Sequence, residues 1–242
     1  MTTVDQIDFK NKKAIIRVDF NVPLNEENKV ADPTRILAAK PTIDAILAQG
    51  GSCILMSHLG RPKGITPALS LSHIVKTVEE ILTVPVQFAQ DSIGDSAQSM
   101  AAKLQPGQVL LLENLRFHEE ETKGDVGFAE QLSKFADVYV NDAFGTAHRA
   151  HASTTIIAQF FSGKKAVGKL LEQEKMLEKK LKNKSEGEVI KLGKMLLEKD
   201  KALLAKDKAS EILIRRQQTQ IDAMDKQLKQ KSVEVQGEIQ EE

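Results

Sequence analysis

The sequence has little cysteine, few aromatic residues and no net charge. Cys53 is the only cysteine among 242 residues, so an intramolecular disulfide is excluded. Its apolar setting, SCILM, favours a buried strand thiol over a reactive one. The 34 Lys and Arg residues balance the 34 Asp and Glu residues, which argues against nucleic-acid binding by bulk charge.

Long hydrophobic runs are missing as well. No stretch is long enough to span a bilayer, and the start, MTTVDQIDF, lacks the basic and apolar regions of a signal peptide. We therefore expect a cytoplasmic protein that does not insert into a membrane.

Proline and aromatic residues do not occur beyond Phe161. Residues 162–242 carry 19 basic and 15 acidic residues, whereas the part before them carries 15 basic and 19 acidic. This change in composition predicts two structural regions, a globular domain over 1–172 and a charged helical extension over 173–242.

Short apolar runs alternate with helical patterns in the first region. The apolar runs are KAIIRV (13–18), SCILMS (52–57), VPVQF (84–88), QVLLLE (108–113) and DVYVN (137–141). The helical patterns cover 33–49, 69–82, 96–104 and 126–136. Continuous apolar strands between helices are typical of an α/β fold, a doubly wound parallel sheet flanked by helices (Rossmann-like).

The sequence pattern of the second region predicts a helix. Four apolar residues keep a seven-residue period, namely Ile214, Ile221, Leu228 and Val235. The complementary seam positions hold polar residues such as Gln218 and Asp225, and a coiled coil fills both sets with apolar side chains. Two interpretations stay open: a long, partly exposed helix or weak coiled coil, and a largely solvated helix with frayed ends.

Polar side chains follow the predicted strands. Five arginines precede residue 162, each after a strand-like run or at the start of the next helix: Arg17, Arg35, Arg61, Arg116 and Arg149. In a doubly wound sheet ligands bind beyond the carboxyl ends of the strands, and the arginine fork grips phosphate or carboxylate with two hydrogen bonds. We therefore predict one basic pocket for a small polyanion, rather than five unrelated surface ion pairs.

Five motifs occur in order along this region. They are RVDFNVPL (17–24), DPTRI with PTIDAIL (32–47), SHLGRPKG (57–64), ENLRFHEEE (113–121) and NDAFGTAHRAHAS (141–153). From about residue 4 to about residue 172 the chain resembles the amino-terminal domain of phosphoglycerate kinase, which binds 3-phosphoglycerate.

The resemblance implies roles for individual residues. Asp19 and Asn21 would contact the hydroxyl and carboxylate end of the glycerate. A basic patch would hold the phosphate and face the transferring group, and it would consist of Arg35, His58, Arg61, Arg116 and Arg149. Arg35 is the residue best placed to stabilise the phosphoryl group during transfer, and Arg17 would belong to the same basic surface. A helix amino terminus near Gly60–Gly64 would assist.

The resemblance also implies what is missing. In the family a second α/β domain carries the nucleotide, and its glycine-rich signatures do not occur in this sequence. We expect no cofactor on this chain, with ATP and Mg²⁺ bound by the missing domain, and no turnover by the chain alone. The alternatives are full kinase activity by this chain, and a scaffolding protein whose tail mediates self-association or binds a partner helix.

Some polar residues have competing interpretations. His148 and His151 with Asp142 could ligate a metal, but no cysteine supports this, and we regard it as the weaker reading. Glu119 to Glu121 are predicted to form a solvated loop. GRPKGIT lacks the spacing of a Walker A sequence, so we assign no nucleotide to it.

Pairing through the tail has a direct test. If residues 173–242 associate as helices, the mass measured by light scattering rises with protein concentration. A strict monomer at high concentration would exclude the scaffolding interpretation.

Overall fold

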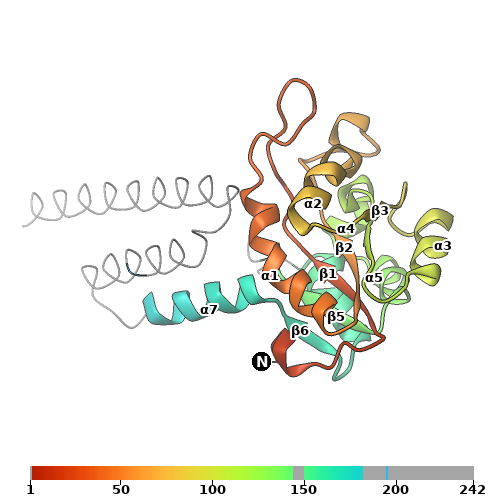
Figure 1. The fold of residues 1–242 in the computed structure, drawn as a ribbon. Coiled ribbons are helices and arrows are strands. Elements are labelled where there is room, and N and C mark those ends of the chain that lie inside the picture. The colour runs from red at the N-terminus through yellow and green to blue at the C-terminus, as the bar shows by residue number, and fades with distance from the viewer. Residues whose placement is uncertain (1, 144–149, 182–194, 196–242) are drawn as a thin grey trace, which may run out of the picture. The chain divides into compact units, whose positions relative to one another are not determined.

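The computed structural model describes residues 2–143, 150–181 and 195. The chain divides into two units, Met1–Lys175 and Met176–Glu242. All described strands belong to the first unit, which forms an α/β structure (Figure 1). None of the described helices has the length and hydrophobicity that a membrane span requires.

Six parallel strands form the sheet, in the order β3-β4-β2-β1-β5-β6. Their bounds are β1 Lys13–Arg17, β2 Ser52–Met56, β3 Val86–Phe88, β4 Val109–Leu111, β5 Val138–Asn141 and β6 Lys165–Val167. The predicted parallel α/β fold is thereby confirmed. The sequence did not predict β6, because three residues that begin with an exposed lysine carry too little apolar pattern.

Helices cover both faces of this sheet (Figure 1). The longer ones are α1 Thr34–Ala48, α2 Val75–Leu82, α3 Asp95–Lys103 and α5 Val126–Ser133. Side chains of a strand alternate between faces, so Ala14 and Ile16 join the core formed with α1 and α2, whereas Ile15 joins the core formed with α3 and α5. Burial on both faces explains why the strands read as continuous apolar runs.

Shorter elements complete the unit. They are the 3₁₀ turns η1 Val4–Gln6, η2 Pro67–Leu69, η3 Leu71–Ile74, η4 Leu115–Phe117 and η6 Ile157–Phe160, the helix α4 Glu119–Lys123 and the π-helical turn η5 Ala152–Ile156. Helix α7, Lys169–Leu181, is the last described element. The predicted coiled coil beyond it lies outside the described residues.

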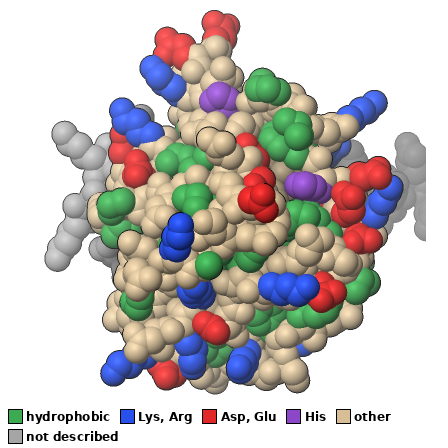
Figure 2. Space-filling view, turned by 90° about the vertical axis from the view of Figure 1, so that its right-hand side faces the viewer, with side chains coloured by type: hydrophobic (Ala, Val, Ile, Leu, Met, Phe, Trp, Pro, Cys, Tyr) green, Lys and Arg blue, Asp and Glu red, His purple; other side chains and the backbone are tan. Residues whose placement is uncertain are grey.

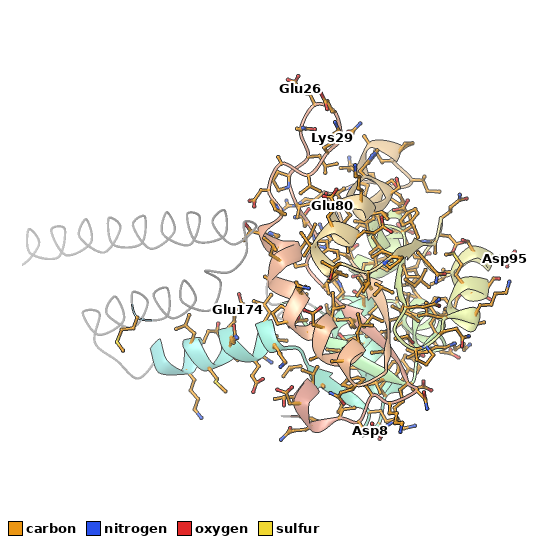
Figure 3. The ribbon with its side chains drawn as sticks, in the orientation of Figure 1. Asp8, Glu26, Lys29, Glu80, Asp95 and Glu174 are labelled. Carbon is orange, nitrogen blue, oxygen red and sulfur yellow. The ribbon has the colours of Figure 1, made fainter. Side chains whose placement is uncertain are left out.

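The carboxyl ends of the strands share one edge. The segment after β1 carries Glu26 and Lys29, which Figure 3 shows far from Asp8, a residue that precedes β1. On the face that Figure 2 draws, Lys and Arg side chains lie among Asp and Glu side chains. A local excess of positive charge must therefore be built by the fold at a particular place.

Gly124 ends α4 in a left-handed conformation, with a φ of +69°. A Cβ there would lie 2.4 Å from the carbonyl oxygen of Ala150. Gly107 has a similar φ of +82° but no atom within 4 Å of its ideal Cβ. Gly124 thus combines a backbone requirement with a close approach, and Gly107 has the backbone requirement alone.

We predict that Gly107→Ala lowers the free energy of unfolding by about 1 kcal/mol, the cost of a left-handed alanine. Gly124→Ala should cost at least about 2 kcal/mol more, because the backbone of Ala150 must shift. Urea denaturation of both variants measures the difference. Equal losses would contradict the close packing of α4 against residue 150.

Candidate anion-binding site

The ends of the central strands are held together by backbone hydrogen bonds. Val18 N donates to Met56 O at 3.0 Å, and Asp142 N donates to Arg17 O at 2.9 Å. The loops that follow β1, β2 and β5 therefore start from neighbouring points at one edge of the sheet. In parallel sheets this edge is where ligands bind.

Arg17 is the last residue of β1, and its side chain is fully buried. Its Nε donates to Ser153 Oγ at 2.8 Å, and its Nη2 lies 3.1 Å from His58 Nδ1. A further nitrogen, Nη1, donates to the carbonyl oxygen of Val18. The expectation that Arg17 belongs to the basic surface is wrong in this respect, because the guanidinium lies beneath the surface and supports it.

His58 follows β2 and is also buried, with 4% of its surface exposed. Burial lowers the pKa of His58 to about 2, with further lowering by the positive charges of Arg17, Arg116 and Arg35 and a smaller contribution from His151. The imidazole is therefore neutral at physiological pH. Three of the five arginines predicted to form the pocket thus lower the pKa of one histidine. Arg17, Arg35 and Arg116 therefore lie in the same region of the molecule.

Asp19 and Arg35 form an ion pair through Asp19 Oδ2 and Arg35 Nη1. The Arg35 side chain is 49% exposed and that of Asp19 is 15% exposed. Arg35 belongs to the first turn of α1 and Asp19 to the loop after β1. The pair holds a solvent-accessible guanidinium at the rim of the site, where it can meet an anion.

Asn21 and Arg116 are joined through Gly60. Gly60 N donates to Asn21 Oδ1 at 2.8 Å, and Arg116 Nη1 donates to Gly60 O at 2.8 Å. Gly60 has a φ of +64°, which a glycine adopts without strain. The backbone N–H and C=O of Gly60 thereby fix the loop after β1 and the loop after β4 against the loop after β2.

Asn114, at the end of the β4 loop, is a residue whose role the sequence did not reveal. It is fully buried, and its Nδ2 donates to Leu59 O and to Leu69 O, both at 2.8 Å. Its Oδ1 accepts the backbone N–H of Arg116 at 3.0 Å. Asn114 therefore positions Arg116 against the loop that carries His58. The signals that the sequence offers for it are its place in the ENLRF motif and its position just after a predicted strand.

Two predicted site residues are less well defined. Arg61 is exposed on the same loop, one residue beyond Gly60. Arg149 lies outside the described residues, as does His148. The predicted helix amino terminus near Gly60–Gly64 is wrong, because that segment leads into the short 3₁₀ turn η2 instead of an α-helix.

The acidic run Glu119 to Glu121 also differs from expectation. It forms α4 instead of a solvated loop, and Glu121 is fully buried. Glu121 accepts two hydrogen bonds from Ser153, one from the hydroxyl at 2.6 Å and one from the backbone N–H at 2.9 Å. Sequence reasoning missed it because its neighbours Glu119, which is exposed, and Glu120, which is half-buried, share its residue type.

Metal binding finds no support in this arrangement. Within residues 2–143, 150–181 and 195, no group of three or more His, Cys, Asp or Glu side chains could hold a metal ion. The described residues therefore offer no ready-made cage of three or more such ligands.

The sequence pattern of the phosphoglycerate kinase family matches residues 4–222. The match covers more than half of the chain and extends past residue 172, where the resemblance seen in the sequence motifs was expected to end. The chain belongs to the phosphoglycerate kinase family.

Relatives named as phosphoglycerate kinases agree with this assignment. The phosphoglycerate kinase of Porphyromonas gingivalis is 50% identical over 71% of this chain and 47% of its own length. The cytosolic phosphoglycerate kinase 3 of Arabidopsis thaliana is 51% identical over 71% of this chain and 43% of its own length. The crystal structure of phosphoglycerate kinase from Pyrococcus horikoshii superposes with a TM-score of 0.66 at 31% identity, over 73% of this chain and 44% of that one.

The chain thus spans less than half the length of these phosphoglycerate kinases. The matched part contains the sheet and the loops at its carboxyl edge. These comparisons lend no support to a scaffolding role.

Asp142 lies directly after β5 at the same edge and is buried. Its Oδ1 accepts the backbone N–H of Leu171 at 3.2 Å, and its Oδ2 has no hydrogen-bond partner among the described residues. Burial raises the pKa of Asp142 from 3.8 to about 6, against the effect of hydrogen bonds from Thr42, Leu171 and Leu170. The native state therefore holds this proton more tightly than the unfolded chain does.

This difference in pKa has a consequence for stability. Between about pH 4 and about pH 6 the folded state binds more protons at Asp142 than the unfolded state, so its contribution is lost as the pH rises. We predict that Asp142→Asn becomes more stable relative to the wild type from about pH 4 to about pH 7. The gain should be about 1.4 kcal/mol per pH unit and approach about 3 kcal/mol.

Thermal or urea unfolding across this pH range measures the effect. Asp8→Asn, which removes a carboxylate that is 75% exposed, is the matched control and should show no such slope. A pH-independent difference between Asp142→Asn and the wild type would contradict the raised pKa.

Proposed function

We propose that the α/β unit of this chain binds 3-phosphoglycerate at the carboxyl edge of its sheet. In the complete reaction it would present the substrate carboxylate to the γ-phosphoryl group of ATP. The observation that carries the proposal is that Arg17 contacts His58, and Arg116 contacts Gly60 two residues further along the same loop. Arg35 stands beside the loop after β1 through its ion pair with Asp19. Membership of the phosphoglycerate kinase family supports it.

The side chains offer complementary hydrogen bonds to such a ligand. A phosphate group and a carboxylate are acceptors, and arginines donate to both in a planar fork. Arg116 is held at Gly60 O by one nitrogen, which orients its guanidinium, and Arg61 and Arg149 complete the proposed patch. Asn21 has its Oδ1 occupied by Gly60 N, so its amide N–H groups can donate to the glycerate end together with Asp19 as an acceptor of the hydroxyl.

The chemistry places few demands on acid–base groups. The acceptor is a carboxylate that is already ionised at neutral pH, so no general base has to remove a proton. An oxygen of that carboxylate attacks the γ-phosphorus, and the bond to the leaving oxygen of ADP breaks. Catalysis then depends on positioning and on neutralising the charge of the transferred group. Arg35, at the exposed rim, is the residue to which we assign this neutralisation.

We propose further that ATP and Mg²⁺ are bound by the part of the family's length that this chain does not span. The ion pair with Asp19 keeps Arg35 near the site before the nucleotide arrives. A cytoplasmic location and association through residues 173–242 remain predictions.

Titration calorimetry of the full chain with 3-phosphoglycerate tests the proposal. Arg35→Ala and Arg116→Ala should each weaken binding by roughly tenfold to a hundredfold, because each removes a charge-assisted contact. Lys76→Ala, which removes a cation that is 87% exposed on α2, is the control and should bind as the wild type does. Equal heats from the wild type and both arginine variants would refute the proposed site.

A further inference from the structure

A continuous chain of hydrogen bonds runs from Glu121 to His58 through the interior. Glu121 Oε1 lies 2.6 Å from Ser153 Oγ, Ser153 Oγ lies 2.8 Å from Arg17 Nε, and Arg17 Nη2 lies 3.1 Å from His58 Nδ1. At least 96% of the surface of each of these four residues is buried, because His58, the most exposed of them, retains 4%. The chain links α4, η5, β1 and the loop after β2.

The direction of every bond in this chain is determined by its chemistry. A guanidinium can only donate, and a carboxylate can only accept. Ser153 Oγ accepts from Arg17 Nε–H, so its single hydrogen is available for Glu121. On the other side Arg17 Nη2–H must donate to His58 Nδ1. The proton of the neutral imidazole therefore sits on Nε2, the ring nitrogen that Arg17 does not contact.

The charge of Arg17 explains why this series of hydrogen bonds has to end at a carboxylate, that of Glu121. Arginine does not lose its proton in proteins, and a buried charge without compensation is strongly destabilising. Glu121 supplies the compensating negative charge. The Ser153 hydroxyl connects it to Arg17, because it donates one hydrogen bond to Glu121 and accepts one from Arg17. The backbone of Ser153 is held as well, since its N–H donates to Glu121 at 2.9 Å and its carbonyl accepts from Tyr139 at 3.0 Å.

We propose that Glu121 and Ser153 are positioning residues, which hold Arg17 so that His58 presents an Nε2–H donor to the anion. The role in ligand binding rests on the proposed function, whereas the effect on His58 does not. A histidine with the opposite tautomer would offer a lone pair at Nε2 and would repel an anionic oxygen. We call the hydrogen-bonded series Glu121–Ser153–Arg17–His58 the relay. It determines whether the His58 imidazole attracts or repels the ligand.

Nitrogen NMR of the histidine rings in the ¹⁵N-labelled full chain, without ligand, tests the relay. The His58 signals are assigned by their loss in His58→Gln. The wild type should show one tautomer, with an unprotonated Nδ1. Ser153→Ala should lose this preference and show a mixture of tautomers, because Arg17 Nε loses its acceptor and its link to Glu121.

Glu121→Gln provides a second disruption that keeps the size of the side chain. Its amide can still accept from the Ser153 hydroxyl, but it carries no charge, and its NH₂ group meets the Ser153 N–H donor. It should therefore also show a mixture of tautomers. Ser153→Thr retains the hydroxyl, so His58 should keep the Nε2–H tautomer of the wild type.

The matched control is Tyr139→Phe. The Tyr139 hydroxyl donates to Ser153 O and to Thr154 O, so this variant loses hydrogen bonds to the backbone of the same segment but removes none of the side-chain hydrogen bonds between Glu121, Ser153, Arg17 and His58. It should keep the wild-type tautomer. A shift of tautomer in Tyr139→Phe equal to that in Ser153→Ala would show a general structural effect and overturn the proposal.

Calorimetry distinguishes a failure of the proposed ligand binding from a failure of the relay. Ser153→Ala and Glu121→Gln should bind 3-phosphoglycerate about tenfold more weakly than the wild type. A wild type that binds no 3-phosphoglycerate would refute the proposed function, and the tautomer measurement would still decide on the relay. A single Nε2–H tautomer in both Ser153→Ala and Glu121→Gln would refute the relay, whatever the affinity.

Discussion

The arrangement of the loops at the carboxyl edge of the sheet depends on the hydrogen bonds of one buried group, the guanidinium of Arg17. It cannot become neutral, so its burial requires acceptors around it and a negative charge within reach. Val18 O, Ser153 Oγ and His58 Nδ1 are those acceptors, and Glu121 is the charge behind Ser153. One cation at the end of the central strand thereby fixes three other segments in place.

The parallel sheet makes this possible. β1 lies between β2 and β5, so a side chain at its end can reach the loops that follow both neighbours. The loops are in turn connected by short links, of which the Gly60 backbone between Asn21 and Arg116 is the clearest. The candidate site is therefore built on strand ends, and strands hold functional side chains more firmly than long loops do.

The chain as a whole has no net charge, and at this edge acidic side chains such as Asp19 and Asp142 accompany the arginines. Several arginines lie near one another, and their mutual repulsion is limited because Asp19 pairs with Arg35 and His58 is neutral. His58 adds a hydrogen-bond donor without adding a charge. An anion that binds here meets positive charge at the rim and a neutral donor beneath it. The ligand proposed above, a small metabolite with a phosphate and a carboxylate, would use both.

Much of this structure follows from local features of the sequence. Apolar runs between helical patterns determined the α/β fold, and polar residues after each run determined which edge carries the site, because parallel strands end on one side. Only the tertiary structure decided that Arg17 is buried and that Glu121, unlike the two glutamates before it, faces the interior. That outcome depends on Ser153, which lies 32 residues away in sequence. Burial of a charge is decided by contacts between distant segments, and no local pattern encodes them.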